Sequence, residues 1–296
     1  MKKFDVIECL DDYIVEADKS RGKIAAPRVV HYYPSEASVV TTDKFGDKVT
    51  YGGCLRQTYY RCTGIDGGET SARQQWIFAL GNAVEDMITQ RAKKAGVWIG
   101  NNVKFYDTAR NISGEVDLIV KDPSDRLVGV EIKSYYGYYA EKEIEGNRSQ
   151  VGKPKMNQLI QTLIYADQFK ASIDYFQMYY MHRGFGRSKG FFVESIPDEL
   201  EDGTIVHRAM LNGKPLGFTM EDIYARVEEL NNYVTNGMLP PRDFEQAYDD
   251  ARIVKDFKNK KLSKKKYEEF TKKGIRPSDW QCSYCAHAKL CAKAGD

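Results

Sequence analysis

The sequence predicts an α/β protein in which helices flank a mixed β-sheet. Two observations carry this prediction. Apolar residues recur at helical spacing from about Ala72 to Ala95, and again in the stretch MNQLIQTLIYADQF. Short runs rich in β-branched and aromatic residues lie before and after that second stretch, as expected of strands. These runs are VKFYDTA, GEVDLIV, LVGVEIKSY, YFQMYYMH and GFFVESI.

The remaining elements follow from local signals. Residues 1–25 read as a polar amphipathic helix. The tetrad DPSD between two apolar runs predicts a turn, because proline presets the first turn dihedral. GFGRSKG reads as a hairpin turn between strands and lacks the residue order of a phosphate-binding loop. MEDIYARVEELNNYV predicts a helix, and Pro240 with Pro241 marks a linker after it.

Composition narrows the classes of function. The chain has 296 residues, 42% of them hydrophobic, and a formal net charge of +2. Acids at Asp5 and Glu8 interrupt any apolar segment of a secretion signal, and no run reaches the roughly 18 apolar residues of a membrane span. We therefore expect a cytoplasmic protein whose six cysteines stay reduced and which has no membrane partner.

Charged residues stand inside two predicted strands. Glu131 and Lys133 are two apart in VGVEIKSY and therefore point to one face. Asp117, in GEVDLIV on the other arm of the hairpin, can reach the same face, and Glu85 on the long helix can add a third carboxylate. Unpaired charge is costly to bury, so a partner or a metal ion is expected there.

These groups suit phosphodiester hydrolysis. Carboxylates bind hard cations such as Mg²⁺ or Mn²⁺, which polarise a phosphoryl oxygen and lower the pKa of an attacking water. The ammonium group of Lys133 can orient that water or neutralise the transition state. The alternative interpretation is a surface hairpin with an incidental ion pair.

The order of these residues resembles that of the PD-(D/E)xK nuclease superfamily, and within it the RecB-type nucleases, over roughly residues 50–296. The motifs are Gly81-x-x-x-Glu85, Gly114-x-x-Asp117, Glu131-x-Lys133 and Gln161-x-x-x-Tyr165. The resemblance implies a PD-(D/E)xK core for residues 72–238. It also implies that Asp117, Glu131, Lys133, Gln161 and Tyr165 are catalytic, and that Glu85, Asp117, Glu131 and Ile132 hold the metal. Val116 stands where many members have proline, and Gln158 could replace Gln161 in a shifted alignment.

Three cysteines, Cys282, Cys285 and Cys291, lie within ten residues near the C-terminus. Zinc would need a fourth ligand. His287 follows Cys285 too closely for one tetrahedron, and we expect it in an exposed loop. Iron–sulphur clusters take four thiolates, often three clustered and one remote.

The spacing Cys-x-x-Cys-x5-Cys resembles that of iron–sulphur nucleases of the RecB group, which include the CRISPR adaptation exonucleases. The resemblance implies a 4Fe–4S cluster on Cys54, Cys282, Cys285 and Cys291, with Cys62 as the alternative fourth ligand. Residues 1–71 would then form a helical segment that contributes one cysteine, and residues 239–296 a basic helical segment that contributes three. The cluster would join the N- and C-terminal segments.

DNA contacts are expected in two places. Tyr135, Tyr136, Arg148 and Lys153 follow the predicted active strand and could stack on bases or contact phosphates. Between Lys255 and Lys273 nine lysines face three acids, among them Lys264, Lys265 and Lys266. A solvated helix face is the alternative interpretation of that run.

The sequence-based hypothesis is therefore a metal-dependent DNA exonuclease acting on single-stranded DNA or single-stranded ends, in a prokaryotic or phage-infected cell. A structure-specific endonuclease with the same site and a catalytically silent, metal-stabilised DNA-binding protein are the alternatives. A second copy of the chain, or recombination and CRISPR adaptation proteins, are the partners that the resemblance implies.

Overall fold

The structure is a computed structural model, and it describes residues 10, 12–16, 31–65, 67 and 71–295. The chain divides into two compact units, each made of two segments. The first contains Met1–Gly53 and Glu69–Glu229, and the second contains Cys54–Gly68 and Leu230–Asp296. Most of the helix predicted over residues 1–25 lies outside the described residues; Leu10 and residues 12–16 are helical.

The first unit is built around a seven-stranded sheet with the strand order β11-β10-β9-β8-β5-β4-β3. Its elements are η1 (Pro34–Glu36), β1 (Ser38–Thr42), β2 (Lys48–Gly52), α3 (Ala72–Lys94), β3 (Trp98–Asp107), β4 (Ile112–Lys121), β5 (Leu127–Tyr135), α4 (Tyr138–Ile144), β6 (Gly146–Asn147), β7 (Gln150–Val151), α5 (Met156–Gln168), β8 (Tyr175–His182), β9 (Ser188–Glu199), β10 (Ile205–Leu211), β11 (Lys214–Thr219) and α6 (Met220–Thr235), which the division between the units crosses.

The sheet is mixed because one connection is a crossover. Strands β5 and β8 pair in parallel, with α5 between them in the chain, whereas the other neighbours pair antiparallel. A parallel pair requires such a crossover, and the helix that makes it covers the sheet. The predicted α/β fold with a mixed sheet and flanking helices is confirmed.

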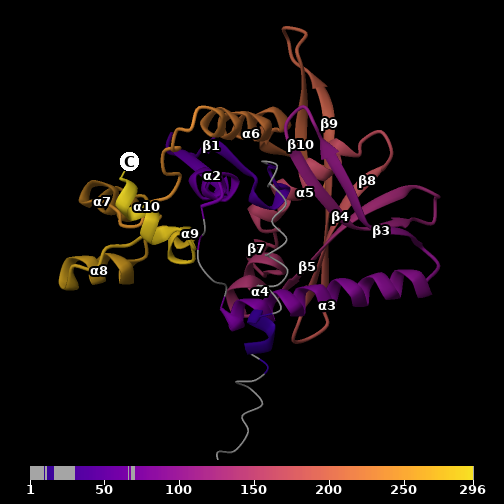
Figure 1. The fold of residues 1–296 in the computed structure, drawn as a ribbon, viewed down its shortest axis with the longest axis horizontal. Coiled ribbons are helices and arrows are strands. Elements are labelled where there is room, and N and C mark those ends of the chain that lie inside the picture. Colours follow the sequence, from indigo (N-terminus) through magenta and orange to yellow (C-terminus); the bar gives the residue numbers. More distant parts are fainter. Residues whose placement is uncertain (1–9, 11, 17–30, 66, 68–70, 296) are drawn as a thin grey trace, which may run out of the picture. The chain divides into compact units, whose positions relative to one another are not determined.

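Helices α3 and α5 cover opposite faces of this sheet. On β5, Val130 and Ile132 join an apolar cluster with Ala92 of α3. The alternate residues face the other way, where Tyr180, the partner of Lys133 on β8, bonds to Gln158 of α5. Figure 1 shows α3 running beside β3, β4 and β5, the three strands that it contacts. Glu131 and Lys133 of β5 therefore lie on the α5 face, whereas Glu85 comes from α3.

Helix ends follow their capping signals. Ser71 and Gln74 form a reciprocal capping box at the start of α3. Ser263 caps α8 (Lys264–Lys273), which ends at Gly274 in the left-handed conformation. One hairpin was not predicted: β10 and β11 are joined by Asn212-Gly213, both with positive φ, which is a strong hairpin signal.

The second unit is helical in its described residues. Its helices are α2 (Leu55–Cys62), α7 (Asp250–Lys258), α8 (Lys264–Lys273), α9 (Trp280–Ser283) and α10 (Ala288–Ala294). Ile253 and Leu262 form a small apolar core with Tyr248. The rings of Phe257 and Tyr267 stack 4.0 Å apart and hold α7 against α8.

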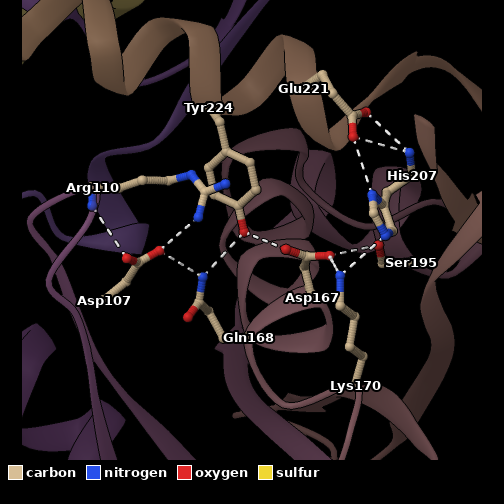
Figure 2. A network of polar contacts seen from close by, with 9 residues as sticks. All are labelled: Asp107, Arg110, Asp167, Gln168, Lys170, Ser195, His207, Glu221 and Tyr224. Atoms are coloured by element: carbon tan, nitrogen blue, oxygen red, sulfur yellow. Dashed lines mark hydrogen bonds and ion pairs between the residues drawn. The ribbon is translucent and has the colours of Figure 1, made fainter. Parts of the chain in front are cut away.

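A polar network fastens the C-terminal end of α5 in the first unit (Figure 2). Tyr224 of α6 donates a 2.7 Å hydrogen bond to Asp167, and Gln168 bonds to both Tyr224 and Asp107. The Arg110 cation lies 4.1 Å from the centre of the Tyr224 ring. Because these residues come from α5, α6 and the β3–β4 connection, the network fixes α5 over the sheet.

Replacing Tyr224 with Phe tests that role. The change leaves an oxygen of Asp167 without its donor, which should lower the free energy of unfolding by about 1–3 kcal/mol. Denaturant unfolding followed by circular dichroism measures the loss. Tyr139→Phe is the matched control, since Tyr139 is 85% exposed, and it should change stability by less than about 0.5 kcal/mol. Equal stability of the two variants would contradict the anchoring role.

Candidate active site and cysteine cluster

Asp117, Glu131 and Lys133 converge where strands β4 and β5 separate. The β4–β5 pairing runs from Lys121–Leu127 to Leu118–Val130. At the next residue the Asp117 carboxylate accepts a 2.7 Å hydrogen bond from the backbone amide of Ile132. Glu131 is fully buried and forms an ion pair with Lys133. The structure thus brings these residues together as the alternation of the strands predicts.

The electrostatics of this group are those of crowded carboxylates. Burial raises the pKa of Glu131 to about 8, and the neighbouring negative charge of Asp117 adds to the shift. Burial would lower the pKa of Lys133, but the carboxylates of Glu131 and Asp117 hold it above its usual value. Lys133 therefore stays an ammonium group at neutral pH.

Glu85 of α3 reaches the same group. Burial, followed by the charge of Asp117, raises the pKa of Glu85 to about 7. Its carboxylate accepts a hydrogen bond of 3.4 Å from Asn102. The third carboxylate anticipated from the sequence therefore lies within electrostatic reach of the strand residues.

Asn102 and Glu115 belong to the site but were not predicted. The side-chain amide of Asn102 donates to Glu115 at 2.6 Å as well as to Glu85, and so links β3, β4 and α3. Asn102 has a φ of +53°, a left-handed conformation that asparagine tolerates better than most residues. Asn102 directly precedes the predicted strand VKFYDTA, and no sequence signal marked it. For Glu115, the one available signal was its place two residues before Asp117 in the same predicted strand.

Gln161 and Tyr165 lie together on α5, over this face of the sheet. The Gln161 amide donates a 2.9 Å hydrogen bond to the Tyr165 hydroxyl, and both side chains are buried. Burial, with the charges of Glu131 and Asp117, raises the pKa of Tyr165, which therefore stays a neutral phenol. Gln158, the alternative, accepts instead from Tyr180 at 2.6 Å.

The donor set fits a hard divalent cation. Apart from the ion pair with Lys133, neither buried oxygen of Glu131 has a hydrogen-bond partner. Glu85 and Asp117 supply further carboxylates, the ligand type that Mg²⁺ and Mn²⁺ prefer. Among the residues that the structure describes, no three His, Cys, Asp or Glu side chains form a group that could hold a metal ion.

Four cysteines of the second unit line one pocket: Cys54, Cys282, Cys285 and Cys291. Burial, followed by the nearby Cys54 thiol, raises the pKa of Cys282 to about 11. Burial also raises the pKa of Cys54 and Cys285. Negative charge on one thiol thus opposes ionisation of the next, which suits a cationic occupant that four thiolates would share.

Cys62 lies outside this set. It is buried in α2 and does not line the pocket, whereas Cys54 stands directly before the first turn of the same helix. The two cysteines are eight residues apart, which is not a whole number of turns at 3.6 residues per turn. The geometry therefore favours Cys54 over Cys62 as the companion of the C-terminal cysteines.

Two neighbours of the cysteine pocket differ from expectation. His287 is 8% exposed and its Nε2 lies 3.0 Å from the carbonyl oxygen of Ile65, so the prediction of an exposed loop residue was wrong. Arg56, which was not predicted, is 2% exposed. Its guanidinium donates to the carbonyls of Pro240 and Gly295 at 2.7 Å and to Cys291 Sγ at 3.6 Å.

One predicted DNA-binding residue is corrected by its burial. Tyr135 is 2% exposed and its hydroxyl donates to Glu145 at 2.7 Å, so its ring cannot stack on a base. Tyr136 is 68% exposed, and Arg148 and Lys153 are exposed in the segment after it. Lys264, Lys265 and Lys266 are exposed in the first turn of α8.

Comparison with known proteins gives one family match. Residues 80–193 match the family model described as NERD, nuclease-related domain. This segment holds Glu85, Asp117, Glu131 and Lys133, together with α5. No helix among the described residues combines the length and hydropathy needed to cross a membrane.

Among solved structures, one described as the crystal structure of SSO0001 is similar, with a TM-score of 0.49 and 12% sequence identity. The similarity covers 97% of this chain and 98% of that one. Comparison with curated proteins gives no match. Over its central part, the chain therefore resembles a PD-(D/E)xK-like, nuclease-related domain with an α/β fold.

Proposed function

We propose that the chain is a metal-dependent nuclease that hydrolyses the phosphodiester bonds of DNA from a strand end and contains a structural 4Fe–4S cluster. One observation carries the proposal. A fully buried Glu131, whose oxygens have no hydrogen-bond partner other than Lys133, lies beside Asp117 on β4, and Glu85 of α3 is within electrostatic reach. The match of residues 80–193 to a nuclease-related domain supports it.

Glu85, Asp117, Glu131 and the backbone of Ile132 would hold Mg²⁺ or Mn²⁺. When bound, such an ion polarises the phosphoryl oxygen and acidifies a water. The chain's own groups do the rest. Lys133 keeps its proton beside two carboxylates and can orient the attacking water or neutralise the charged phosphoryl oxygens. Gln161 and Tyr165, bonded to each other, position the α5 side of the site.

The cysteine pocket supports the second part of the proposal. Cys54, Cys282, Cys285 and Cys291 would hold a 4Fe–4S cluster, as in the iron–sulphur nucleases that the spacing resembles. Four thiolates leave such a cluster coordinatively closed, so its role is structural and not hydrolytic. It would tie the segment after residue 53 to the C-terminal segment, both of which belong to the second unit.

Exposed aromatic and basic residues support DNA as the substrate. Tyr136, Tyr138 and Tyr139 follow the active strand and are 68%, 69% and 85% exposed. Bases stack on such exposed rings without regard to sequence. The exposed lysines at the start of α8 can contact phosphates.

Isosteric variants test the catalytic assignment. Asp117→Asn, Glu131→Gln and Lys133→Met should each lower cleavage at least about hundredfold, because each removes a charge that stabilises the transition state. DNA binding should remain. End-labelled single- and double-stranded DNA with Mg²⁺ or Mn²⁺, followed by product sizing, measures cleavage and separates exonuclease from endonuclease products.

Asp125→Asn is the matched control for these variants. Asp125 lies in the turn of the same hairpin, is exposed and has a φ of +64°, which asparagine tolerates. It should cleave at the wild-type rate. Wild-type cleavage by any of the three site variants would remove that residue from the proposal, and wild-type protein that binds DNA without cleaving it would point to a silent DNA-binding protein.

The raised pKa values predict a pH dependence in protein freed of divalent ions. Burial raises the pKa of Glu85 from 4.5 to about 7 and that of Glu131 to about 8. A carboxyl that holds its proton more tightly when folded contributes stability that is fully present below its unfolded pKa. That stability is lost as pH rises through the folded value. Metal-free protein should therefore be less stable near about pH 8 than near about pH 5.

Thermal unfolding in chelator at both pH values measures this loss, and Glu85→Gln should reduce it because the amide does not ionise. Added Mg²⁺ or Mn²⁺ should restore stability at the higher pH in wild type more than in Glu85→Gln. An identical pH profile in the two proteins would contradict the charge crowding at Glu85.

Cysteine variants test the cluster. Anaerobically purified protein should be brown and contain about four irons per chain. Cys54→Ala and Cys282→Ala should bleach the colour and lower the melting temperature, whereas Cys62→Ala, the matched control in α2, should keep the iron. One zinc and no iron would overturn the cluster and leave the nuclease site untouched. Loss of colour in Cys62→Ala, with the colour kept in Cys54→Ala, would make Cys62 the fourth ligand in place of Cys54.

A further inference from the structure

A cavity of about 330 Å³ lies beside the candidate active site in the first unit. Its lining includes Tyr33, Ser35, Lys104, Phe105, Glu115 and Tyr165. Two of these residues connect it to the site. Glu115 lies two residues before Asp117 on β4 and accepts from Asn102, which also bonds to Glu85. Tyr165 is bonded to Gln161.

The outer wall of the cavity is held in place by the backbone. Tyr32 pairs with the start of β4: its amide donates to Asn111 at 2.8 Å, and its carbonyl accepts from Ser113 at 3.1 Å. The Tyr32 ring is 2% exposed and anchors the segment. The next residue, Tyr33, is 43% exposed and lines the cavity. An aromatic ring is thus presented on a fixed support.

The floor of the cavity is aromatic because β4 has a glycine there. A Cβ at Gly114 would lie 2.6 Å from the Phe105 ring and 2.9 Å from the Tyr165 ring. Without one, the two rings pack edge to face, 5.7 Å apart, directly over the strand. Gly114 is therefore required for the rings to form this surface.

Hydrogen-bond donors and hydrogen-bond acceptors both lie at the rim of the cavity. The ammonium group of Lys104 lies 3.8 Å from a carboxylate oxygen of Glu115, and the two side chains are 81% and 37% exposed. Hydroxyls of Ser35 and Ser113 add groups that can donate or accept. A free phosphate would be repelled by Glu115, and a hydrocarbon ligand would leave these groups unpaired. A flat aromatic ligand with both donors and acceptors on its edge satisfies the whole lining.

We propose that this cavity binds the unpaired base of the DNA nucleotide that adjoins the scissile phosphate, so that the nuclease takes a single nucleotide at an open strand end. Its volume is at the small end of ligand pockets, about 300–1,000 Å³, and suits one nucleoside and not a base pair. Tyr33 stacks on the base, while Lys104 and Glu115 meet its edge. The inference rests on the proposed nuclease function and specifies its substrate as a frayed or single-stranded end.

The test uses single-stranded oligonucleotides that carry the fluorescent base 2-aminopurine at either end or at an internal position. Chelator in the buffer prevents cleavage. Stacking on an aromatic ring quenches this base, so wild-type protein should quench it several-fold more at one end than internally. Tyr33→Ala should abolish the end-specific quenching and weaken binding of the oligonucleotide about tenfold.

Two further variants make the test specific. Ser35→Leu extends an aliphatic side chain, which cannot stack on the base, into the cavity from its exposed rim, and should abolish end-specific quenching without loss of secondary structure. Tyr51→Ala removes a tyrosine that is 37% exposed on β2, outside the cavity, and should behave as wild type. Equal quenching at terminal and internal positions in wild type, or full quenching by Ser35→Leu, would overturn the proposal.

Fluorescence anisotropy of an end-labelled oligonucleotide, and a parallel cleavage assay with Mg²⁺, separate the two hypotheses. Cleavage with no preference for a terminal base overturns the cavity assignment and leaves the nuclease intact. Absence of both DNA binding and cleavage overturns the nuclease and this inference with it.

Discussion

A carboxylate and an ammonium group, Glu131 and Lys133, are enclosed in the middle of the sheet, and the surrounding architecture follows from keeping them there. Taking a charge out of water costs several kcal/mol unless an opposite charge accompanies it. Strand alternation carries both groups to the face under α5. On the opposite face, apolar residues of β4 and β5 pack against α3, and this burial offsets the cost of the charges.

The single positive charge of Lys133 balances only part of the negative charge in this group. Two further carboxylates, Asp117 and Glu85, face one ammonium group. Burial raises the pKa of Glu85 and of Glu131, and the neighbouring carboxylates add to the shift. Perturbed groups of this kind concentrate at functional sites, because chemistry requires charges that a purely structural core would avoid. Such a surplus of negative charge supports the cation site proposed for this group.

Features that depend on local periodicity can be predicted from the sequence, whereas features that depend on tertiary packing cannot. The common face of Glu131 and Lys133 and the pairing of Gln161 with Tyr165 are consequences of strand and helix period, which are local properties. Asn102 is different: its contacts depend on a left-handed backbone and on where α3 packs. Burial is also non-local. Nothing in the run of tyrosines distinguishes the buried Tyr135 from the exposed Tyr136 until α4 and β8 are placed.

The second unit draws on two segments of the chain separated by the first unit's sheet. Leu55 and Arg56 of the earlier segment bond to Asp243 and Pro240 of the later one. During synthesis these partners follow only after more than half of the chain has been made, when every strand of the sheet has already been synthesised. The cysteine pocket therefore cannot be completed until the final segment of the chain has been made.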